Sequence, residues 1–261
     1  MRLVTWNINS LRLRLPTLAR VAETLAPDIV CLQEIKVVDG DFPADAVRAL
    51  GFDHLLYRGM KSYNGVAIAS RVPLREIPGR QWCEKDDCRH LGAVLPDGTE
   101  LHNFYVPAGG DIPDPVANDK FAHKLAFLEE MTGWGGKLKA APRILVGDLN
   151  IAPLETDVWS HKQLLGVVSH TPVEVEGLAG AMAAHGWIDA VRAFIPPEEQ
   201  LYTWWSYRNR EWPGSDRGRR LDHIWVTPPL REKLRAAAVL REARGWDRPS
   251  DHVPVSLDIA L

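Results

Sequence analysis

Carboxylate, amide and imidazole side chains adjoin several short apolar runs of this sequence, at positions where strands would begin or end. Glu34 follows the run 29–32, Asp148 follows the run 144–146, and Asp251 and His252 precede the run 253–259. A charge held at the end of a buried strand is costly to leave unpaired, because burial removes its hydration. A cation or a charged substrate would relieve that cost, so these positions are candidates for a site in a cleft.

Glu34 is the first candidate metal ligand. Together with Asn7 and Asp251 it offers an all-oxygen donor set, which suits a hard ion such as Mg²⁺. Mg²⁺ keeps several of its waters and takes few protein carboxylates. The alternative is that Glu34 pairs with a neighbouring Arg or Lys.

The stretch Gly147-Asp148-Leu149-Asn150 is the second candidate. Glycine permits a tight turn after the apolar run, and residues two apart on an extended chain face the same side. Asp148 could therefore orient or deprotonate a water while Asn150 steadies a phosphoryl oxygen. The alternative is an Asx turn that uses both side chains locally.

Asp222 and His252 form the third candidate. Each lies at the start of a predicted strand, so the two side chains could pair across a sheet. A carboxylate would fix the tautomer of the imidazole and raise its pKa, which suits a phosphate contact or general acid/base work. Adjacent Asp251 should point the other way, so that one residue can bind metal while the other contacts substrate. The alternative for His252 is a turn cap.

The elements that must position these residues alternate between strand and helix patterns. Residues 3–8, 29–32, 54–57, 65–70, 92–95, 101–106, 143–146, 221–226 and 253–259 are predicted strands. Residues 16–25, 44–50, 120–131 and 173–185 are predicted helices. This mixture indicates an α/β or α+β layered fold, and no linker divides residues 1–261 into two domains.

Composition narrows the function classes. No apolar run approaches the roughly 20 residues that a membrane span needs, and no secretory signal precedes residue 7, so we expect a soluble cytoplasmic protein. Three cysteines cannot all pair, which indicates reduced thiols. Cys83, Cys88 and His90 lack a convincing fourth ligand for a structural zinc. Nucleotide-binding and serine-hydrolase motifs are absent from the sequence.

The net charge of −3 excludes overall basicity, so nucleic-acid affinity would need a local basic cluster. Residues 202–220, YTWWSYRNREWPGSDRGRR, hold five arginines and five aromatic residues. These arginines, with Arg12, Arg14 and Lys61, are candidates for phosphate contacts that position a duplex without reading its sequence. They could equally pair with Asp216 and Glu211 on the surface.

Eight short motifs, taken together in their order and spacing, resemble the exonuclease III family of AP endonucleases. They are W-N-I-N (6–9), L-Q-E-I-K (32–36), N-G-V-A (64–67), N-F-Y-V-P (103–107), G-D-L-N (147–150), Y-T-W-W (202–205), R-L-D-H (220–223) and S-D-H-V-P-V (250–255). The resemblance runs from Leu3 to about Leu257. It implies a DNase I-like four-layer sandwich, with two packed mixed β-sheets flanked by helices, and Mg²⁺-dependent phosphodiester hydrolysis for which Mn²⁺ could substitute.

The resemblance also implies a role for each matching residue. Asn7, Glu34 and Asp251 surround the metal. The residues it implies at the reacting phosphate are Tyr105, which approaches the phosphate, Asp148 and Asn150, which handle the attacking water, and His252, which is held by Asp222 and contacts a phosphate oxygen. Asp148 is the favoured base, since a short carboxylate beside an amide could hold water in line with phosphorus.

The implied substrate-binding residues are Asn9, Trp204 and Arg219, and the implied partner is double-stranded DNA with abasic sites, nicks or 3′ ends. Trp204 matches an aromatic wall of the family's pocket, whereas Arg219 stands where relatives carry Trp or another apolar residue. Ala108 also departs, replacing an amide side chain. Both departures bear on abasic-site preference rather than on hydrolysis.

A monomer would suffice for this function. The rival interpretations are a same-superfold hydrolase of an inositol phosphate, a phospholipid or RNA, and a non-catalytic DNA-binding module.

Overall fold

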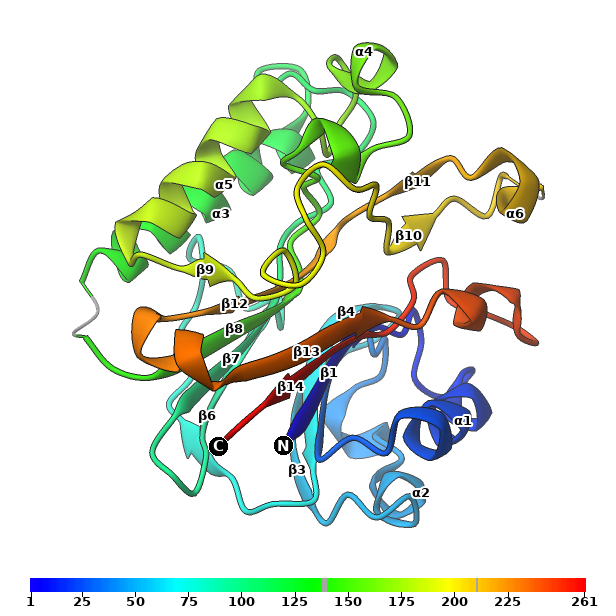
Figure 1. Cartoon of the computed structure of the whole chain (residues 1–261), viewed down its shortest axis with the longest axis vertical. Coiled ribbons are helices and arrows are strands. Elements are labelled where there is room, and N and C mark those ends of the chain that lie inside the picture. Colours follow the sequence, from blue (N-terminus) through cyan, green and yellow to red (C-terminus); the bar gives the residue numbers. More distant parts are fainter. Residues whose placement is uncertain (138–139, 210) are drawn as a thin grey trace.

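Runs of apolar residues form two six-stranded β-sheets that pack face to face (Figure 1). The structure is a computed structural model, and it describes residues 1–137, 140–209 and 211–261. The first sheet has the order β13-β14-β1-β2-β4-β3 and the second has the order β5-β6-β7-β8-β12-β9. A separate two-stranded ribbon joins β10 to β11.

The strands of the first sheet are β1 (Arg2–Asn7), β2 (Ile29–Gln33), β3 (His54–Met60), β4 (Tyr63–Ser70), β13 (Leu234–Val239) and β14 (Val255–Ile259). Those of the second sheet are β5 (Arg75–Ile77), β6 (His90–Val94), β7 (Glu100–Tyr105), β8 (Arg143–Asp148), β9 (Ile188–Asp189) and β12 (Asp222–Val226). The ribbon consists of β10 (Trp204–Trp205) and β11 (Gly218–Arg219).

The helices are α1 (Leu15–Leu25), α2 (Ala44–Arg48), α3 (Asp119–Gly135), α4 (His161–Leu164), α5 (Pro172–Ala184) and α6 (Trp212–Ser215). Four short 3-10 segments cover Asp39–Asp41, Glu155–Asp157, Pro228–Lys233 and Arg241–Gly245. Helices α1 and α2 lie against the outer face of the first sheet, and α3 and α5 lie against the outer face of the second (Figure 1).

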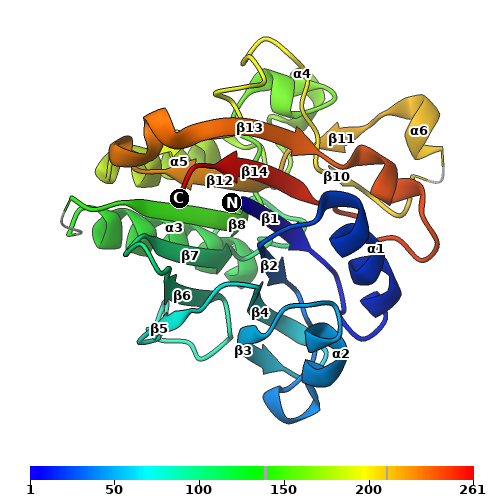
Figure 2. The ribbon, with the colours of Figure 1, turned by 60° about the horizontal axis from the view of Figure 1, so that its bottom comes forward.

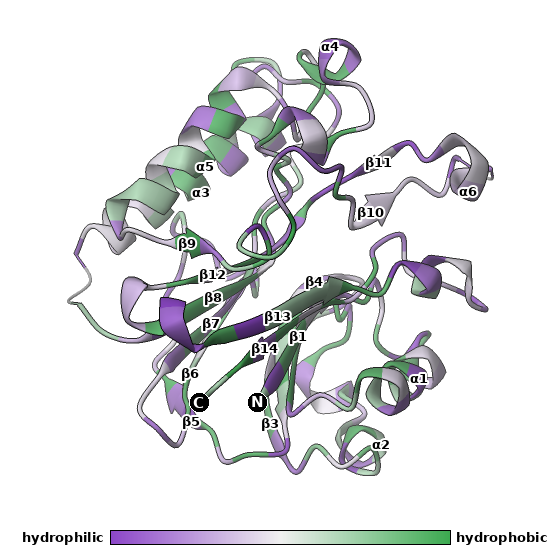
Figure 3. Ribbon diagram, viewed as in Figure 1, coloured by the Kyte–Doolittle hydropathy of each residue, from purple (hydrophilic) through white to green (hydrophobic). Residues whose placement is uncertain are grey.

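Alternate residues along one strand enter different cores, which produces the four layers. In β2, Ile29 and Cys31 pack between the sheets, whereas Val30 and Leu32 pack toward the helical side. Strands buried on both faces need continuous apolar runs, which explains why these strands were predictable from sequence. Hydrophobic colouring accordingly follows the central strands, while β11 is hydrophilic (Figure 3).

The two ends of the chain meet in the first sheet. Strand β14 pairs antiparallel with β1, with Arg2 opposite Asp258. The Arg2 guanidinium donates to both carboxylate oxygens of Asp258, at 2.7 and 2.8 Å. Figure 2 shows β13, β14 and β1 side by side with the two termini close together. The segment before β14 is therefore returned to the end of β1.

The predicted layered fold is confirmed, and the differences are local. Strand β6 begins at His90 rather than at residue 92, and β14 begins at Val255 rather than at residue 253. The predictions missed β5, β9, β10, β11 and β13, because these strands are short or rich in charged and alanine residues. Within the described residues, no helix combines the length and apolarity that crossing a membrane requires.

Candidate active site

Two sheets present their strand ends to one cleft. Asn7 ends β1, and Glu34 directly follows β2, its parallel neighbour. In the second sheet, Tyr105 of β7 lies opposite Asp148 of β8, which in turn lies opposite Asp222 of β12. All five residues were predicted site residues, and the facing of the two sheets brings them together.

Asn7 links the two sheets at the base of the cleft. Its Nδ2 donates to Glu34 Oε1 at 2.9 Å and to Asp148 Oδ2 at 2.8 Å. Glu34 Oε1 also accepts from the Tyr105 hydroxyl at 2.8 Å. Burial alone would raise the pKa of Glu34, but the Lys36 ammonium and these hydrogen bonds lower it below its usual value. Glu34 is therefore held as a carboxylate.

Lys36 is a site residue that the sequence argument did not assign, although it lies in the quoted motif L-Q-E-I-K. Its Nζ lies 2.7 Å from Glu34 Oε2 and 2.7 Å from Asn9 Oδ1. Asn9 Nδ2 then donates to Asp251 Oδ1 at 3.0 Å. The alternative of a lysine partner for Glu34 is thus realised, and the ammonium supplies positive charge at the carboxylates of the cleft.

Asp148 is buried and accepts hydrogen bonds on both oxygens. The Asn150 backbone N–H donates to Oδ1 at 2.9 Å, and the Asn150 side-chain amide donates to Oδ2 at 3.2 Å. The first contact is the local turn that was the alternative for this motif. Both side chains take part in local contacts, because the Asn150 amide also donates to Val106 O at 2.9 Å. Burial raises the pKa of Asp148 to about 7, against the opposing charge of His252.

His252 lies between two carboxylates. Its Nδ1 is 2.8 Å from Asp222 Oδ2, and its Nε2 is 3.6 Å from Asp148 Oδ2. Thr203 Oγ1 donates to the same Asp222 oxygen at 2.6 Å. Burial opposes charge on the imidazole, but Asp222 and Asp148 outweigh it and raise the pKa of His252 to about 10. The ring is therefore a cation that faces the cleft.

One geometric expectation needs correction. Asp222 and His252 do pair, but β12 and β14 belong to different sheets, so the contact crosses the gap between sheets and not a ladder within one. The reason is that β14 returns to β1, whereas β12 pairs with β8. Residues this far apart in sequence carry no local signal of which sheet they join.

Asp251 and His252 serve different partners, as the alternation of side chains predicts. Asp251 accepts from Asn9 Nδ2 and, at 3.0 Å, from Trp204 Nε1, and its pKa is lowered because His252 and these donors outweigh burial. Both Asp251 and Glu34 line the cleft. Their ionised oxygens and the nearby Asn7 amide form a donor set that fits a hard divalent cation.

A second acidic grouping lies beside that set. Ligand atoms of Asp148, Asp222 and His252 lie within 4.8 Å of one another. A hydrogen bond from the imidazole to Asp222 and its ion pair with Asp148 account for this proximity, and the cationic ring disfavours a metal there. The oxygen set around Glu34 and Asp251 is therefore the better metal candidate.

The cleft above these residues has a volume of about 760 Å³ and includes Trp204 and Arg219 in its walls. A neighbouring groove of about 520 Å³ shares Glu34 and Ala108 with it and is lined by basic and aromatic side chains, namely Lys36, Tyr63, Arg89, Lys120 and His123. Both hollows reach the candidate site at Glu34, and basic side chains that would attract a polyanion line each of them.

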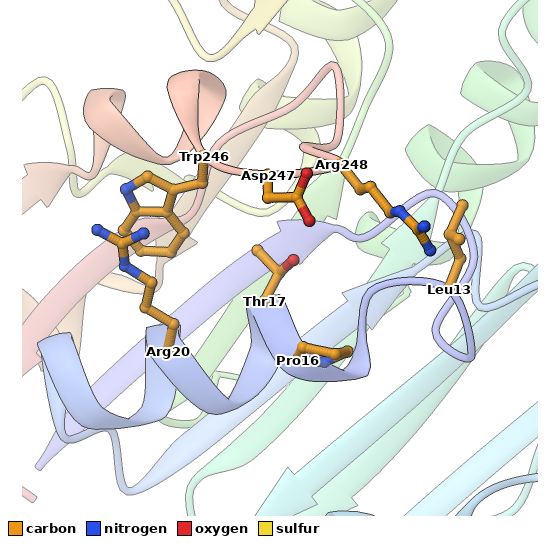
Figure 4. Close-up of a pocket in the computed structure, with 7 residues that line it drawn as sticks. All are labelled: Leu13, Pro16, Thr17, Arg20, Trp246, Asp247 and Arg248. Carbon is orange, nitrogen blue, oxygen red and sulfur yellow. The ribbon is translucent and has the colours of Figure 1, made fainter.

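A smaller pocket of about 260 Å³ lies apart from these groups, between α1 and the loop after Arg241–Gly245 (Figure 4). Figure 4 shows Arg20 stacked on Trp246, with the guanidinium carbon 4.0 Å from the ring centre. Asp247 is the one carboxylate among its lining residues, and no histidine lines it. It therefore lacks the chemistry of the larger cleft.

The predicted phosphate-contact residues divide into two groups. Arg220 is buried and pairs with Asp157 at 2.9 Å and Asp189 at 2.7 Å, so its prediction as a DNA contact is wrong. Arg14 is also buried, and it donates to the Tyr207 hydroxyl at 2.8 Å and to Arg248 O at 3.1 Å. Arg210 lies outside the described residues. The exposed members of the predicted group are Arg12, Lys61, Arg208 and Arg217.

The fold and this cleft define a class of protein: a two-sheet sandwich with carboxylate, amide and imidazole side chains gathered where the facing strands end. Residues 4–252 match the model of the Endonuclease/Exonuclease/phosphatase family, and the chain belongs to this family. Its relatives include exodeoxyribonuclease III of Haemophilus influenzae, which is 29% identical over 98% of each chain. They also include an exodeoxyribonuclease of Bacillus subtilis, which is 30% identical over the full length of both.

Solved structures agree. An AP endonuclease from Archaeoglobus fulgidus superposes with a TM-score of 0.92 at 30% identity, and each chain is covered completely. The 3′ phosphatase NExo from Neisseria, solved with a product DNA hairpin, superposes with a TM-score of 0.91 at 31% identity, again with complete coverage. The chain is thus a phosphodiester hydrolase of the exonuclease III group, and the predicted DNase I-like sandwich is confirmed.

Proposed function

We propose that the chain is a Mg²⁺-dependent DNA repair nuclease, which hydrolyses phosphodiesters of double-stranded DNA at 3′ ends, nicks or abasic sites. The observation that carries the proposal is the arrangement across the cleft: a cationic imidazole and a buried carboxylate face an ionised all-oxygen cluster. The names of the relatives, exodeoxyribonuclease and AP endonuclease, support DNA as the substrate.

Asp148 acts as the general base in this proposal. Its oxygens are oriented by Asn7 and Asn150, and a pKa of about 7 lets it accept a proton from water near neutral pH. The Asn150 amide donates to Val106 O at 2.9 Å and to Asp148 Oδ2 at 3.2 Å, and it would exchange the second, longer contact for a phosphoryl oxygen. The oxygen of water then bonds to phosphorus, and the bond from phosphorus to the 3′ oxygen breaks.

His252 and Tyr105 stabilise charge at the phosphoryl group. The imidazolium is held by Asp222, so it contacts a phosphate oxygen without reorganising during the reaction. The Tyr105 hydroxyl, fixed on Glu34, approaches the same group from the second sheet. Asn7, Glu34 and Asp251 would hold Mg²⁺, with Mn²⁺ as a substitute, and the ion supplies charge neutralisation on the phosphoryl and leaving oxygens.

The substrate-binding residues in this proposal are Asn9, Trp204 and Arg219. Asn9 donates to Asp251 and accepts from Lys36, which places it at the rim of the metal set. Trp204 and Arg219 line the cleft, and Trp204 Nε1 donates to Asp251 Oδ2 at 3.0 Å.

One gel assay tests the proposed function. The purified protein is incubated with an abasic-site duplex, a blunt duplex and a nicked duplex with a 3′-phosphate, each with Mg²⁺ or with EDTA. We expect cleavage of at least one DNA substrate with Mg²⁺ and none with EDTA. Hydrolysis of inositol phosphates with every DNA left intact would replace DNA as the substrate. DNA binding without any hydrolysis would indicate a non-catalytic module.

A further inference from the structure

Arg219 and His252 project into the cleft from the same row of backbone. Trp204 pairs with Arg219 in the β10–β11 ribbon and forms a bridge with His252 on its other side. Directly opposed residues in a ladder point to the same face, so the three side chains share the cleft wall. Figure 1 shows β10 and β11 side by side above the segment that leads into β14. Arg219 thus stands about two strand spacings, roughly 10 Å, from His252 along the backbone.

The Arg219 guanidinium is held in place. Its Nη1 donates to Val168 O at 2.8 Å and to Ser169 Oγ at 2.7 Å, and its guanidinium carbon lies 5.3 Å from the Trp204 ring centre. Ser169 is itself fixed, because its backbone N–H donates to both carboxylate oxygens of Glu174 at 2.9 Å. The cation is therefore preorganised before any substrate arrives.

Within the described part of the chain, Arg219 has no ion-pair partner, and the one carboxylate whose charge acts on it, that of Glu174, is itself paired with Lys124. No carboxylate of the described residues lies within 4.0 Å of its guanidinium, in contrast to Arg220 next to it, which pairs with two. Its buried Nε has no hydrogen-bond partner among the described groups. A half-buried guanidinium bonded only to neutral oxygens retains its attraction for an anion, which would meet it at Nη2, because Nη1 is engaged and Nε is buried.

We propose that Arg219 is a specificity-determining residue, which makes this cleft favour DNA 3′ ends whose terminal group carries extra negative charge over a neutral base-free sugar. This proposal rests on the proposed function. A 3′-phosphate and a carboxylate-ended 3′-phosphoglycolate share that chemistry. In both, the oxygen of water bonds to phosphorus, the bond to the 3′ oxygen breaks, and a 3′-hydroxyl remains as the phosphate or phosphoglycolate leaves.

The physical basis is that the surroundings of the Arg219 guanidinium differ between the two kinds of bound substrate. With a neutral sugar the guanidinium stays partly desolvated and without an ion-pair partner from the residues that the structure describes, whereas an anionic end gains a charge-assisted hydrogen bond. Hydrogen bonds to charged groups contribute about 1.5–3 kcal/mol, which corresponds to roughly 10- to 100-fold in kcat/KM. The effect should fall on the substrate that carries the extra charge and should spare the others.

The test compares kcat/KM for three nicked or intact duplexes, with a 3′-phosphate, a 3′-phosphoglycolate or an internal abasic analogue. We expect Arg219→Gln to lower kcat/KM roughly 10- to 100-fold for the two charged ends and to leave the abasic analogue the same or faster. Arg219→Lys keeps the charge but loses the fork, so it should lie between the two. Loss confined to the phosphoglycolate would assign the contact to the terminal carboxylate, and loss confined to the 3′-phosphate would assign it to the phosphate monoester.

Arg217→Gln is the matched control, because Arg217 also lines the cleft but is exposed and stacks on Trp159. A phosphate contact that only positions the duplex should affect all three substrates alike. Equal losses for all three substrates in Arg219→Gln, or an unchanged ratio, would overturn the proposal. If the Arg219 variant unfolds, Ser169→Ala takes its place in the test. It removes one hydrogen-bond partner of the guanidinium and keeps Arg219 itself, so it should partly reduce the preference for charged 3′ ends.

Failure of this inference is separable from failure of the proposed function. A wild-type protein that hydrolyses none of the three DNAs would remove both. If the wild type hydrolyses them and Arg219→Gln leaves the ratio of their kcat/KM values unchanged, only the inference about Arg219 fails.

Discussion

At the scale of single residues, the candidate site places a carboxylate that can take up a proton near neutral pH beside an imidazole that stays charged there. Asp148 is pushed toward neutrality by burial, while His252 is kept charged by Asp222. Because their environments move the two pKa values apart, one group can transfer a proton while the other stabilises charge. The two side chains face each other at 3.6 Å, so a change in either alters both.

Replacing Asp148 by asparagine keeps the shape of the side chain but removes the proton acceptor. We expect kcat to fall by roughly 10²- to 10⁴-fold, the range that a general base contributes, with little change in KM. Steady-state cleavage of a 3′-blocked duplex measures it. Asp53→Asn, at an exposed position, is the control and should keep the wild-type rate. A near-normal rate for Asp148→Asn would exclude this carboxylate as the base.

Asp222 sets the charge of His252, which a titration can follow. Because the folded-state pKa is raised to about 10, charge on His252 stabilises the fold below its ordinary pKa of about 6.5, and that contribution is lost as the pH rises through about 10. In Asp222→Asn the imidazole should lose its proton at a lower pH. Nitrogen NMR of the histidines measures this. A wild-type His252 that is already neutral at pH 8 would contradict the assignment.

Residue types were the part of the site that sequence could predict. Glu34, Asp148 and His252 adjoin apolar runs, and a buried strand end restricts the chemistry open to such groups. Lys36 and Thr203 were not assigned, because their contacts depend on side chains brought from other elements. The exclusion of Arg220 from the DNA surface was equally invisible, since its partners Asp157 and Asp189 come from distant segments.

At the scale of elements, close approach of β7 and β8 sets the position of Asp148. Gly147 has φ of +146°, and a Cβ built there would lie 1.9 Å from Phe104 O on the neighbouring strand. Only a residue without a side chain lets the two strands pair in this register. The glycine of G-D-L-N is therefore required by the strand pairing: it lies within β8, and the turn that the sequence led us to expect at this glycine begins only at Asp148.

Gly147→Ala should lower the free energy of unfolding by about 1–3 kcal/mol or more, because the strands must separate to admit the methyl group. Gly133→Ala is the matched control: this glycine lies in α3, and its added methyl would meet nothing within 4 Å. That change should raise stability by about 0.4–1 kcal/mol. Urea unfolding of both variants decides the matter, and equal effects would refute the packing argument.

Element prediction succeeded where burial is two-sided. Strands β1, β2 and β8 combine apolar residues on both faces, so their sequences clearly indicate buried strands. Strand β13, Leu234–Val239, carries an arginine and three alanines and lies at a sheet edge, where half-exposure leaves a weak pattern. The ribbon strands β10 and β11 are two residues each, which is too short for any periodicity.

At the scale of the whole molecule, the site exists because two sheets with separate hydrogen-bond ladders face each other. Asn7, Glu34 and Asp251 come from the first sheet and its connections, whereas Tyr105, Asp148 and Asp222 come from the second. Sequence patterns could not assign β12 and β14 to different sheets, since each run is equally apolar. Hydrogen bonds across the gap, such as those from Asn7 to Asp148 and between His252 and Asp222, fix the positions of the site residues relative to one another.

In the proposed function, this division between sheets separates the metal ligands from the general base, and a Mg²⁺ titration of activity tests that separation most directly. Cleavage of a 3′-blocked duplex is measured against Mg²⁺ concentration for the wild type, Glu34→Ala and Asp148→Asn. We predict that Glu34→Ala needs more Mg²⁺ for half-maximal activity and recovers part of its rate at high Mg²⁺, whereas Asp148→Asn stays slow at every concentration. Full wild-type activity in EDTA, or equal rescue of both variants, would contradict the account.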